Sequence, residues 1–399
     1  MEATEDHQLG PGDTAGDAAA GQRATVDASV SFATALYGEA ARGEGNLFLA
    51  PASVFMALVM TYAGARGETA GEMARALRLP ELDPSRLHAM HGALAVGLEG
   101  APGIELAGAS AVFGQKDGGF LPAFVALLAE HYRVGLREVD FETDAERART
   151  TINRWVEQAT KGKIADLVPF GIVTTLTRLV LVSAIAFKGA WAACFDEKDT
   201  IKECFFRLTD NFVLMPLMHR IGHYKLAAVD DAHLLEMPYE GGALAMVIVL
   251  PDKKKGLLDV EAKLGARLRV WLGVLDQNTG ETPCEVEVTL PRFRIEASLR
   301  LDEPLKHLGM RRAFDPNAAD FSGMNGRQHD LHIAAALHKA FVDVNEQGTT
   351  AAAATAVVVA TRSRSIPPHR FRADHPFLFL VRDLCTGSIL FLGRLVDPS

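Results

Sequence analysis

The sequence predicts an α+β fold in which helices and strands are segregated along the chain. Helix-like segments dominate the first half, and β-like runs follow from Leu179 onward, at 179–187, 244–250 and 286–290. A doubly wound sheet would instead alternate strands with helices at regular intervals. The chain has 399 residues, of which 48% are hydrophobic, and no linker rich in Pro, Ser or charge divides it internally. We therefore expect one compact domain with a large core.

The first 24 residues are predicted to be a disordered tail that precedes a single domain at 25–399. They are rich in Gly, Ala and Asp and have no apolar periodicity. Acidic residues near the start and the lack of an apolar core argue against a secretory signal. No run approaches the ~18 consecutive apolar residues of a membrane helix, so we expect no membrane partner.

Four segments have the composition and periodicity of helices, namely 26–42, 53–64, 121–132 and 145–158. In the first, Phe32, Leu36 and Ala40 lie on one stripe of the helix. In the second, Ser53 is the expected N-cap, because its hydroxyl can accept a hydrogen bond from a free backbone N–H.

Charge and cysteine content exclude several classes of function. The formal net charge of −9 argues against nucleic-acid binding, which needs a basic face. The longest basic run, at 253–255, is typical of a solvated turn. The four cysteines, Cys194, Cys204, Cys284 and Cys385, have no spacing suited to metal or redox chemistry. We expect free thiols, no metal and no cofactor; a pair between Cys194 and Cys204 is the alternative, if a hairpin joins them.

The most informative stretch is residues 346–365, a run of small residues that ends in arginines. From Thr349 to Thr361 no residue is charged, aromatic, glycine or proline. In a strand, alternate side chains face opposite sides, and both faces of this run are small enough to enter a sheet. A charge on the buried face would cost several kcal/mol. An alanine-rich helix and a low-complexity linker are the alternatives that the local sequence leaves open.

Strand-like segments flank this run on both sides and favour a mobile segment held between strands. Upstream, residues 337–346 alternate in character. Downstream, two apolar runs at 371–381 and 388–398 are separated by a polar turn with Thr386 and Gly387, which indicates a hairpin.

These motifs resemble the carboxy-terminal third of the serpins. In that family a hinge of the form E-x-G-T-x-A-A-A-A-T leads to a reactive loop, then to F-x-A-D-H-P-F-L-F and I-L-F-x-G-R. Further matching segments follow in order over residues 26–399, at 46–53, 62–69, 152–156, 160–164, 179–191, 235–239, 246–251, 290–293 and 319–324. The resemblance implies three β-sheets, eight or nine helices and an exposed reactive-centre loop at about 346–370.

The resemblance also implies a mechanism, in which the loop is cut by a serine protease and inserts into the central sheet while the acyl-enzyme is still attached. The hinge and inserting strand would comprise Glu346, Gly348, Thr349, Ala351, Ala353, Thr355, Val357 and Val359. The reactive bond is expected at Arg362–Ser363, with Arg364–Ser365 as the alternative. Arginine there suits a trypsin-like protease, whose specificity pocket holds an aspartate.

The family match assigns control of sheet opening to four positions, Ser53, Ser183, Trp191 and His338. It places His338 beneath the sheet, within reach of a neighbouring strand and of the Ser53 hydroxyl; a satisfied core histidine is the alternative. The chain departs from the family at Ser183, where Asn is common, and at Ala50, where Ser is common. We therefore expect a weakly clamped sheet that inserts or polymerises readily.

The hinge departs from the family at Thr350, where Glu is common. Thr350 should point outward in the inserted strand, so we expect no loss of inhibition there. Thr349 should face inward, and Thr349→Arg should convert an inhibitor into a substrate.

No catalytic motif is present: the sequence lacks a G-x-S-x-G elbow, an H-E-x-x-H helix and a phosphate-binding loop. We therefore expect an inhibitor of a trypsin-like serine endopeptidase and not an enzyme. The alternative is a non-inhibitory relative acting as chaperone, carrier or storage protein, although such relatives tend to have charged or bulky hinge residues.

The expected partner is the protease, bound as a covalent acyl complex to a monomer that tends to polymerise. Some relatives bind heparin-like polyanions through a basic helix, but the matching residues 86–99 have one Arg, two His and Glu99, so no such site is expected. Family resemblance predicts an extracellular protein, and the lack of a visible signal makes a cytoplasmic one the alternative.

Overall fold

The computed structural model describes residues 11–96, 102–132, 136–209, 211–277, 283–349 and 367–399. These residues contain nine α-helices: α1 (Pro11–Ala40), α2 (Pro51–Tyr62), α3 (Gly67–Leu77), α4 (Pro84–Val96), α5 (Pro122–Tyr132), α6 (Ala145–Ala159), α7 (Leu257–Gln277), α8 (Asp302–His307) and α9 (Ser322–Asn325). Six of the nine precede the strand β4 (Leu179–Ala190), so the predicted segregation of helices toward the first half is confirmed. In the described ranges, no helix is both long and apolar enough to cross a membrane.

The predicted disordered tail, residues 1–24, can be compared with the structure from Pro11 onward. The helix α1 begins at Pro11 and crosses the predicted boundary at residue 25, so residues 11–24 are helical and not an irregular tail. Gly21 and Thr25 are buried in this part of α1, and the Thr25 hydroxyl lies 3.9 Å from the sulfur of Met90 in α4. α1 therefore packs on α4 at Gly21 and Thr25, within a helix whose first part was predicted from composition alone to be disordered. That residues 25–399 form a single domain stays a prediction.

Ser53 is not the N-cap of α2. The helix begins at Pro51, its N-cap is Ala50, and no side chain caps it. Proline at the first helical position needs no N–H partner and has the right backbone angle, so it starts the helix on its own. The Ser53 hydroxyl is thereby free to make contacts with the sheet.

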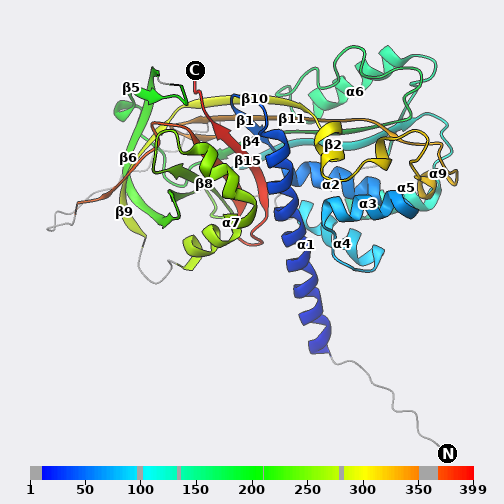
Figure 1. Cartoon of the computed structure of the whole chain (residues 1–399), viewed down its shortest axis with the longest axis horizontal. Helices are drawn as coiled ribbons and strands as arrows, with labels where there is room; N and C mark the ends of the chain where they lie inside the picture. Colours follow the sequence, from blue (N-terminus) through cyan, green and yellow to red (C-terminus); the bar gives the residue numbers. More distant parts are fainter. Residues whose placement is uncertain (1–10, 97–101, 133–135, 210, 278–282, 350–366) are drawn as a thin grey trace, which may run out of the picture.

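The central sheet has six strands in the order β10-β11-β12-β4-β2-β3. Their bounds are β10 (Phe293–Arg300), β11 (Ile333–Asn345), β12 (Gly348–Thr349), β4 (Leu179–Ala190), β2 (Ile104–Gln115) and β3 (Arg137–Val139). The helices α6 and α2 lie on opposite sides of this sheet (Figure 1). Alternate residues of β4 accordingly pack on opposite sides, Val182 with Ile152 of α6 and Leu181 with Leu58 of α2.

The remaining strands form two sheet sections that share the long strand β6 (Phe212–Val229). Residues 225–229 of β6 pair with β7 (Ala232–Pro238), and that section continues through β8 (Leu244–Pro251), β14 (Phe377–Asp383), β15 (Ile389–Leu395) and β1 (Leu47–Leu49). Residues 212–224 pair with β5 (Ile201–Phe206) and β9 (Cys284–Pro291), and β13 (His369–Arg372) pairs with β9. With the central sheet, these sections are the three predicted sheets, and the predicted C-terminal hairpin is the antiparallel pair β14–β15.

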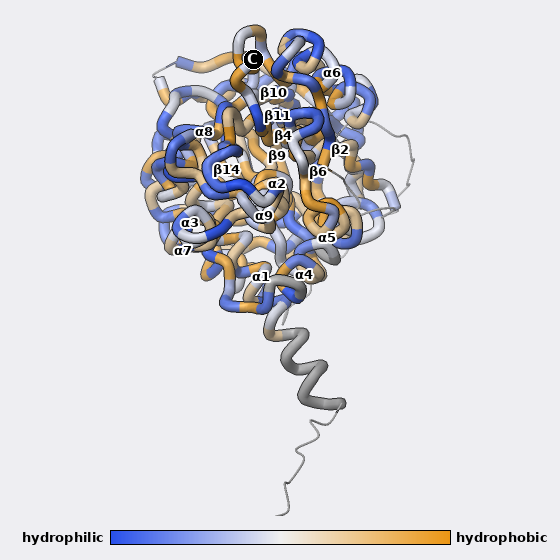
Figure 2. Tube along the Cα trace, turned by 90° about the vertical axis from the view of Figure 1, so that its right-hand side faces the viewer, coloured by the Kyte–Doolittle hydropathy of each residue, from blue (hydrophilic) through white to orange (hydrophobic). Residues whose placement is uncertain are grey.

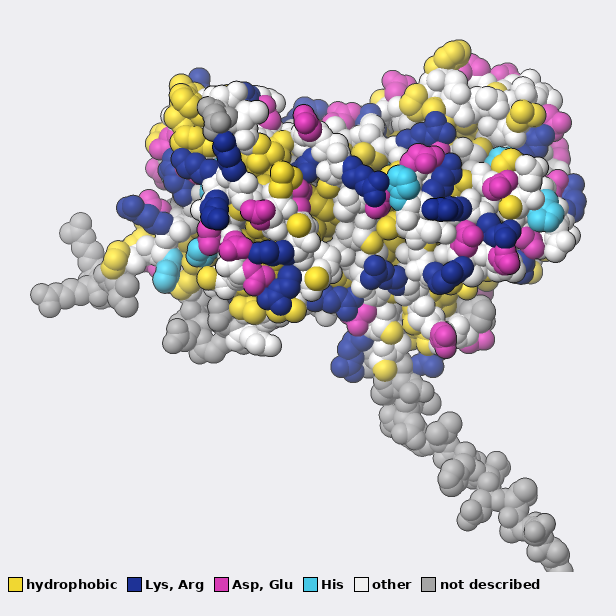
Figure 3. All heavy atoms as spheres, in the orientation of Figure 1, with side chains coloured by type: hydrophobic (Ala, Val, Ile, Leu, Met, Phe, Trp, Pro, Cys, Tyr) yellow, Lys and Arg dark blue, Asp and Glu magenta, His cyan; other side chains and the backbone are white. Residues whose placement is uncertain are grey.

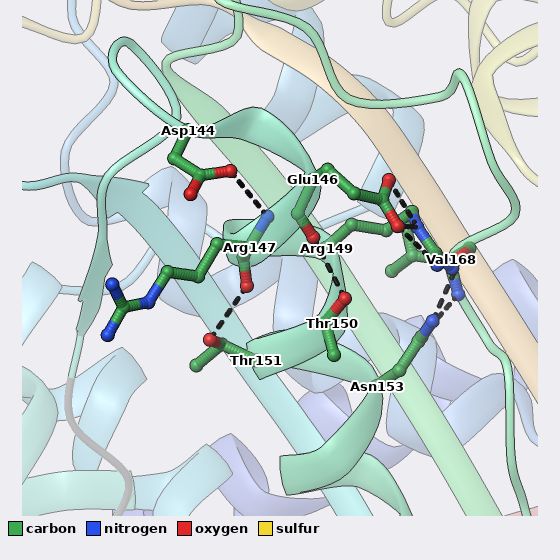
Figure 4. A network of polar contacts seen from close by, with 8 residues as sticks. All are labelled: Asp144, Glu146, Arg147, Arg149, Thr150, Thr151, Asn153 and Val168. Atoms are coloured by element: carbon green, nitrogen blue, oxygen red, sulfur yellow. Dashed lines mark hydrogen bonds and ion pairs between the residues drawn. The ribbon is translucent and has the colours of Figure 1, made fainter.

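Seen from the side, the hydrophobic stretches of the chain concentrate in the interior strands, and hydrophilic stretches in the outer turns (Figure 2). Polar contacts cap the N-terminus of α6 and join its middle to the segment that follows it (Figure 4). The Asp144 carboxylate accepts a hydrogen bond from the Arg147 backbone N–H at 2.9 Å, as an N-cap does. The Asn153 side chain bonds both the N–H and the C=O of Val168, at 2.8 and 3.0 Å. The cap stabilises the first turn of α6, and the Asn153 contacts tie the helix to the segment that follows it.

Candidate functional site

The chain that follows β11 turns back and enters the central sheet. β12 lies between β11 and β4 and is antiparallel to both, with Thr349 paired to Val344 of β11 and to Gly189 of β4. Further along, β11 and β4 pair with each other directly and in parallel, from Ile333–Leu179 to Phe341–Ala186. We call residues 346–349 the hinge and this direct pairing the seam. The hinge therefore lies at the end of the seam marked by Phe341 and Ala186.

Gly348 is required by the close approach of the hinge to β4. Its φ is +141°, a backbone angle that L side chains rarely adopt. A Cβ placed on Gly348 would lie 2.1 Å from the carbonyl oxygen of Gly189 and 2.7 Å from the Cα of Ala190. These are backbone atoms of a central strand, so the neighbours cannot move aside as a flexible side chain would.

The Thr349 side chain is enclosed next to aromatic side chains beneath the sheet. The side chain is 0% exposed, and its hydroxyl lies 2.9 Å from the hydroxyl of Tyr239. Trp191 stacks on Tyr239 with ring centroids 4.7 Å apart, and its Nε1 donates to the carbonyl of Asn345 at 3.0 Å. Burial raises the pKa of Tyr239 above its usual value, so the phenol is neutral at physiological pH. The surroundings of Thr349 therefore accommodate a small neutral side chain.

Glu346 anchors the start of the hinge. Its side chain is 4% exposed and its Oε1 lies 2.5 Å from the guanidinium of Arg292. The Thr200 hydroxyl donates to the same oxygen at 2.5 Å. The carbonyl of Glu346 accepts from the backbone N–H of Phe195 at 2.9 Å. The carboxylate is thus paired and hydrogen-bonded, which offsets the cost of burying its charge.

His338 lies in the middle of the seam, directly opposite Ser183. The imidazole is 0% exposed, and its Nε2 accepts the backbone N–H of Ala50 at 3.0 Å. Nδ1 therefore has the proton, and it donates to the carbonyl of Ser183 at 3.0 Å. Burial lowers the pKa of His338 to about 4, so the ring is neutral at pH 7.

A chain of hydroxyls joins α2 to β2 and to the two strands of the seam. The Ser53 oxygen lies 2.7 Å from the Ser110 oxygen of β2 and 2.9 Å from the Ser183 oxygen of β4. The Ser183 hydroxyl in turn lies 3.0 Å from Nδ1 of His338. The expected direct bond between His338 and Ser53 is therefore replaced by a link through Ser183. The four predicted control positions divide into two places, with Trp191 at the hinge and Ser53, Ser183 and His338 at the seam.

Four contacting residues were missed from the sequence: Tyr239, Ser110, Arg292 and Thr200. Tyr239 ends one of the matched segments, 235–239, and this could have indicated it. Arg292 likewise lies within the matched segment 290–293. Ser110 and Thr200 come from parts of the chain far apart in sequence, and nothing local distinguishes them from other polar residues.

Several predicted site residues lie outside the described residues. They are Thr350, Ala351, Ala353, Thr355, Val357, Val359 and both candidate bonds, Arg362–Ser363 and Arg364–Ser365.

The surface predictions can be compared with the structure in part. Residues 253–255 lie in an exposed turn, as predicted. All four cysteines are free, so the pairing of Cys194 with Cys204 is excluded. On the face seen in Figure 3, basic and acidic side chains are interspersed.

Known proteins resemble this chain in both sequence and structure. Residues 27–398 match the model of the family described as serpin (serine protease inhibitor). The chain is 42% identical over 364 residues to the leukocyte elastase inhibitor of Bos taurus, which covers 89% of this chain and 93% of that protein. It is 39% identical to an uncharacterized serpin-like protein of Thermococcus kodakarensis, covering 95% of this chain and 87% of the relative. The crystal structure of Serpin48 from the insect Tenebrio molitor superposes with a TM-score of 0.81 at 30% identity, covering 94% of this chain and 98% of that one.

Proposed function

The chain belongs to the serpin family, and we propose that it inhibits a serine protease as a suicide substrate, with Arg362–Ser363 as the attacked bond. The observation that supports this most strongly is the position of β12 between β11 and β4. Two residues of the segment that precedes the loop are already strand members of the central sheet, and the seam beyond them is where further residues would enter.

The register of β12 predicts where each inserted residue would lie. If the strand continues in the pairing of Gly348 and Thr349, Thr355 comes opposite both His338 and Ser183. It would share the inward face with Thr349, so its hydroxyl would meet the buried imidazole. A small polar side chain could then replace the contact between Ser183 and His338 that insertion breaks.

The outward face of the inserted strand would pass beneath α6. In the closed sheet, Leu337 and Phe341 of β11 belong to the same hydrophobic cluster as Ile152 and Val156 of α6. The outward residues that would follow Thr350 into this layer are Ala352, Ala354, Ala356, Val358 and Ala360. All are small and uncharged, so they can enter this layer without burying a charge.

Insertion supplies the inhibitory step. Fourteen residues separate Gly348 from Arg362, which corresponds to about 46 Å of strand at ~3.3 Å per residue. A protease acylated by Arg362 would be displaced over this distance. The positions of its catalytic groups, on which the deacylation rate depends, would be distorted. The chain itself needs no catalytic group, so we assign it no enzymatic activity.

The residue at the attacked bond sets the class of protease. The Bos taurus relative is named for elastase, whose specificity pocket is small, whereas the pocket of trypsin holds an aspartate that pairs with arginine. Arg362 therefore supports a trypsin-like target for this chain. Among the residues from Thr349 to Thr361, none is large or charged, so a trypsin-like enzyme has no earlier residue to bind.

The free thiols support the cytoplasmic alternative for the location of the protein. All four cysteines are unpaired, as is usual in a reducing compartment. We propose a monomeric inhibitor there, with the covalent protease complex as its assembly.

Mixing the protein with trypsin and, separately, with elastase tests the proposal. We expect an SDS-stable complex with trypsin at the summed mass, and a released fragment that begins at Ser363. Arg362→Val should abolish the trypsin complex, and Arg364→Val, the matched control, should preserve it. The reverse pattern would move the bond to Arg364–Ser365, and complete cleavage without any complex would support the non-inhibitory alternative.

A further inference from the structure

A cavity of about 270 Å³ lies beneath the central sheet, where α1, α2 and α4 meet β2 and β15. α2 contacts α1, β2 and β15 around it (Figure 1). Its apolar wall is formed by Phe55, Met56, Leu106, Ile185, Leu390 and Phe391. Its polar groups include the hydroxyls of Ser53 and Ser110 and the side chains of His91 and Asp383. Ser53 and Ser110 belong to the hydroxyl chain described above, but no function has been assigned to the space itself.

His91 is an unusual member of the lining. It is 3% exposed, and its Nε2 has no hydrogen-bond partner among the described residues. Buried polar atoms in folded proteins are nearly always paired. The ring lies against Phe55, with centroids 5.1 Å apart. Burial lowers the pKa of His91 to about 4, so at pH 7 the imidazole is neutral and one of its nitrogens is a hydrogen-bond acceptor.

The size and charge of the cavity define what fits. An apolar cavity of roughly 150 Å³ holds a benzene ring, so the larger space here suits one or two fused rings. The carboxylate of Asp383 on the lining disfavours an anion. The position of Gly108 leaves room on the β2 side, since an added Cβ would meet its nearest neighbour, Ile185, at an ordinary 3.6 Å.

We propose that this cavity binds a small uncharged aromatic molecule with one N–H or O–H group, the ring between Phe55 and Phe391 and the polar group directed to His91. The bound molecule would also contact Ser53 and Ser110, which join α2 to β2. Such a ligand binds the folded chain and stabilises it by mass action. This proposal does not depend on protease inhibition.

Thermal unfolding of the full chain with increasing indole tests the proposal. We expect the Tm to rise with indole concentration, and 1-methylindole, which lacks the N–H, to bind roughly fivefold more weakly. His91→Phe keeps an aromatic ring beside Phe55 and should make the two probes bind equally. Gly108→Leu fills the cavity from β2 and should remove the Tm shift.

An unchanged Tm in the wild-type chain, or an indole shift that persists in Gly108→Leu, would overturn the proposal. If Gly108→Leu does not fold, Leu106→Trp fills the same space from a neighbouring position. A crystal structure of the wild-type chain with indole decides independently of any variant, because density in the cavity supports the proposal and density elsewhere refutes it.

Discussion

Replacing Thr349 by arginine should convert the protein from an inhibitor into a substrate. The Thr349 side chain is 0% exposed and its hydroxyl contacts Tyr239, which is itself buried under Trp191. Arginine at position 349 would place a charge next to two aromatic rings, with no carboxylate among the contacts just described. The hinge of the variant should therefore leave the space between β11 and β4.

The magnitude follows from the burial of the charge. An unpaired ion in a buried position costs about 3–5 kcal/mol. If about 3 kcal/mol of this is added to the barrier for insertion, the insertion rate falls roughly 150-fold. Deacylation by the protease does not involve the hinge and is unchanged. Hydrolysis then precedes insertion in almost every encounter.

The assay is the number of inhibitor molecules consumed for each trypsin molecule trapped. We expect this number to rise from near one to many for Thr349→Arg, with the loop still cleaved at Arg362. Thr350→Arg is the matched control, because its side chain should point outward and leave trapping intact. Equal trapping by Thr349→Arg and the wild type would show that the insertion register is wrong.

Three further predictions concern stability. Gly348→Ala should lower the free energy of unfolding by about 1–3 kcal/mol, because the added Cβ meets backbone at 2.1 Å; thermal melts should show no such loss for Gly38→Ala, where nothing lies within 4 Å. The pKa of His338 is lowered from 6.5 to about 4, so the unfolded chain binds more protons between these values, and the free energy of unfolding should fall as the pH drops from about 6.5 toward 4, by up to about 3 kcal/mol. His338→Gln should make that pH dependence shallower without abolishing it, because the buried His91 also has a lowered pKa; a slope equal to that of the wild type in denaturant titrations would reject the assignment. Ser53→Ala removes one hydrogen-bond partner from each of the hydroxyls of Ser110 and Ser183. Incubation near the melting onset should therefore give polymers on native gels sooner than for the wild type. Monomer that persists in both proteins would contradict a weakly clamped sheet.

Local signals in the sequence predicted individual helices and strands, whereas the three-sheet architecture was implied by the resemblance to the serpins. Alternation in residues 337–346 and the apolar runs after residue 371 predicted strands, and β11, β14 and β15 lie there. Boundaries that depend on tertiary contacts were missed. α1 extends back to Pro11 and packs on α4 at Thr25, and α2 starts at a proline two residues before Ser53.

The site could be predicted in part for the same reason. Gly348 and Thr349 stand out in the sequence as a flexible residue followed by a small one. Their partners, Tyr239 and the backbone of Gly189, are identified only when the fold brings distant strands together. The effect of Ser183 on how firmly the sheet is clamped can also be judged only from the fold. The hydroxyl of Ser110 lies close enough to Ser53 to extend the hydrogen-bond chain, and the sequence did not indicate this contact.

A disulfide across the seam tests the central claim, that the loop enters between β11 and β4. Phe341 and Ala186 are the last pair of the seam before β12, so Phe341→Cys combined with Ala186→Cys can lock the strands together at the point of entry. In the oxidised variant, we predict that trypsin cleaves the loop and leaves free, with no SDS-stable complex, and that reduction of the same sample restores trapping. A complex that forms equally fast with the disulfide intact would contradict insertion at this seam.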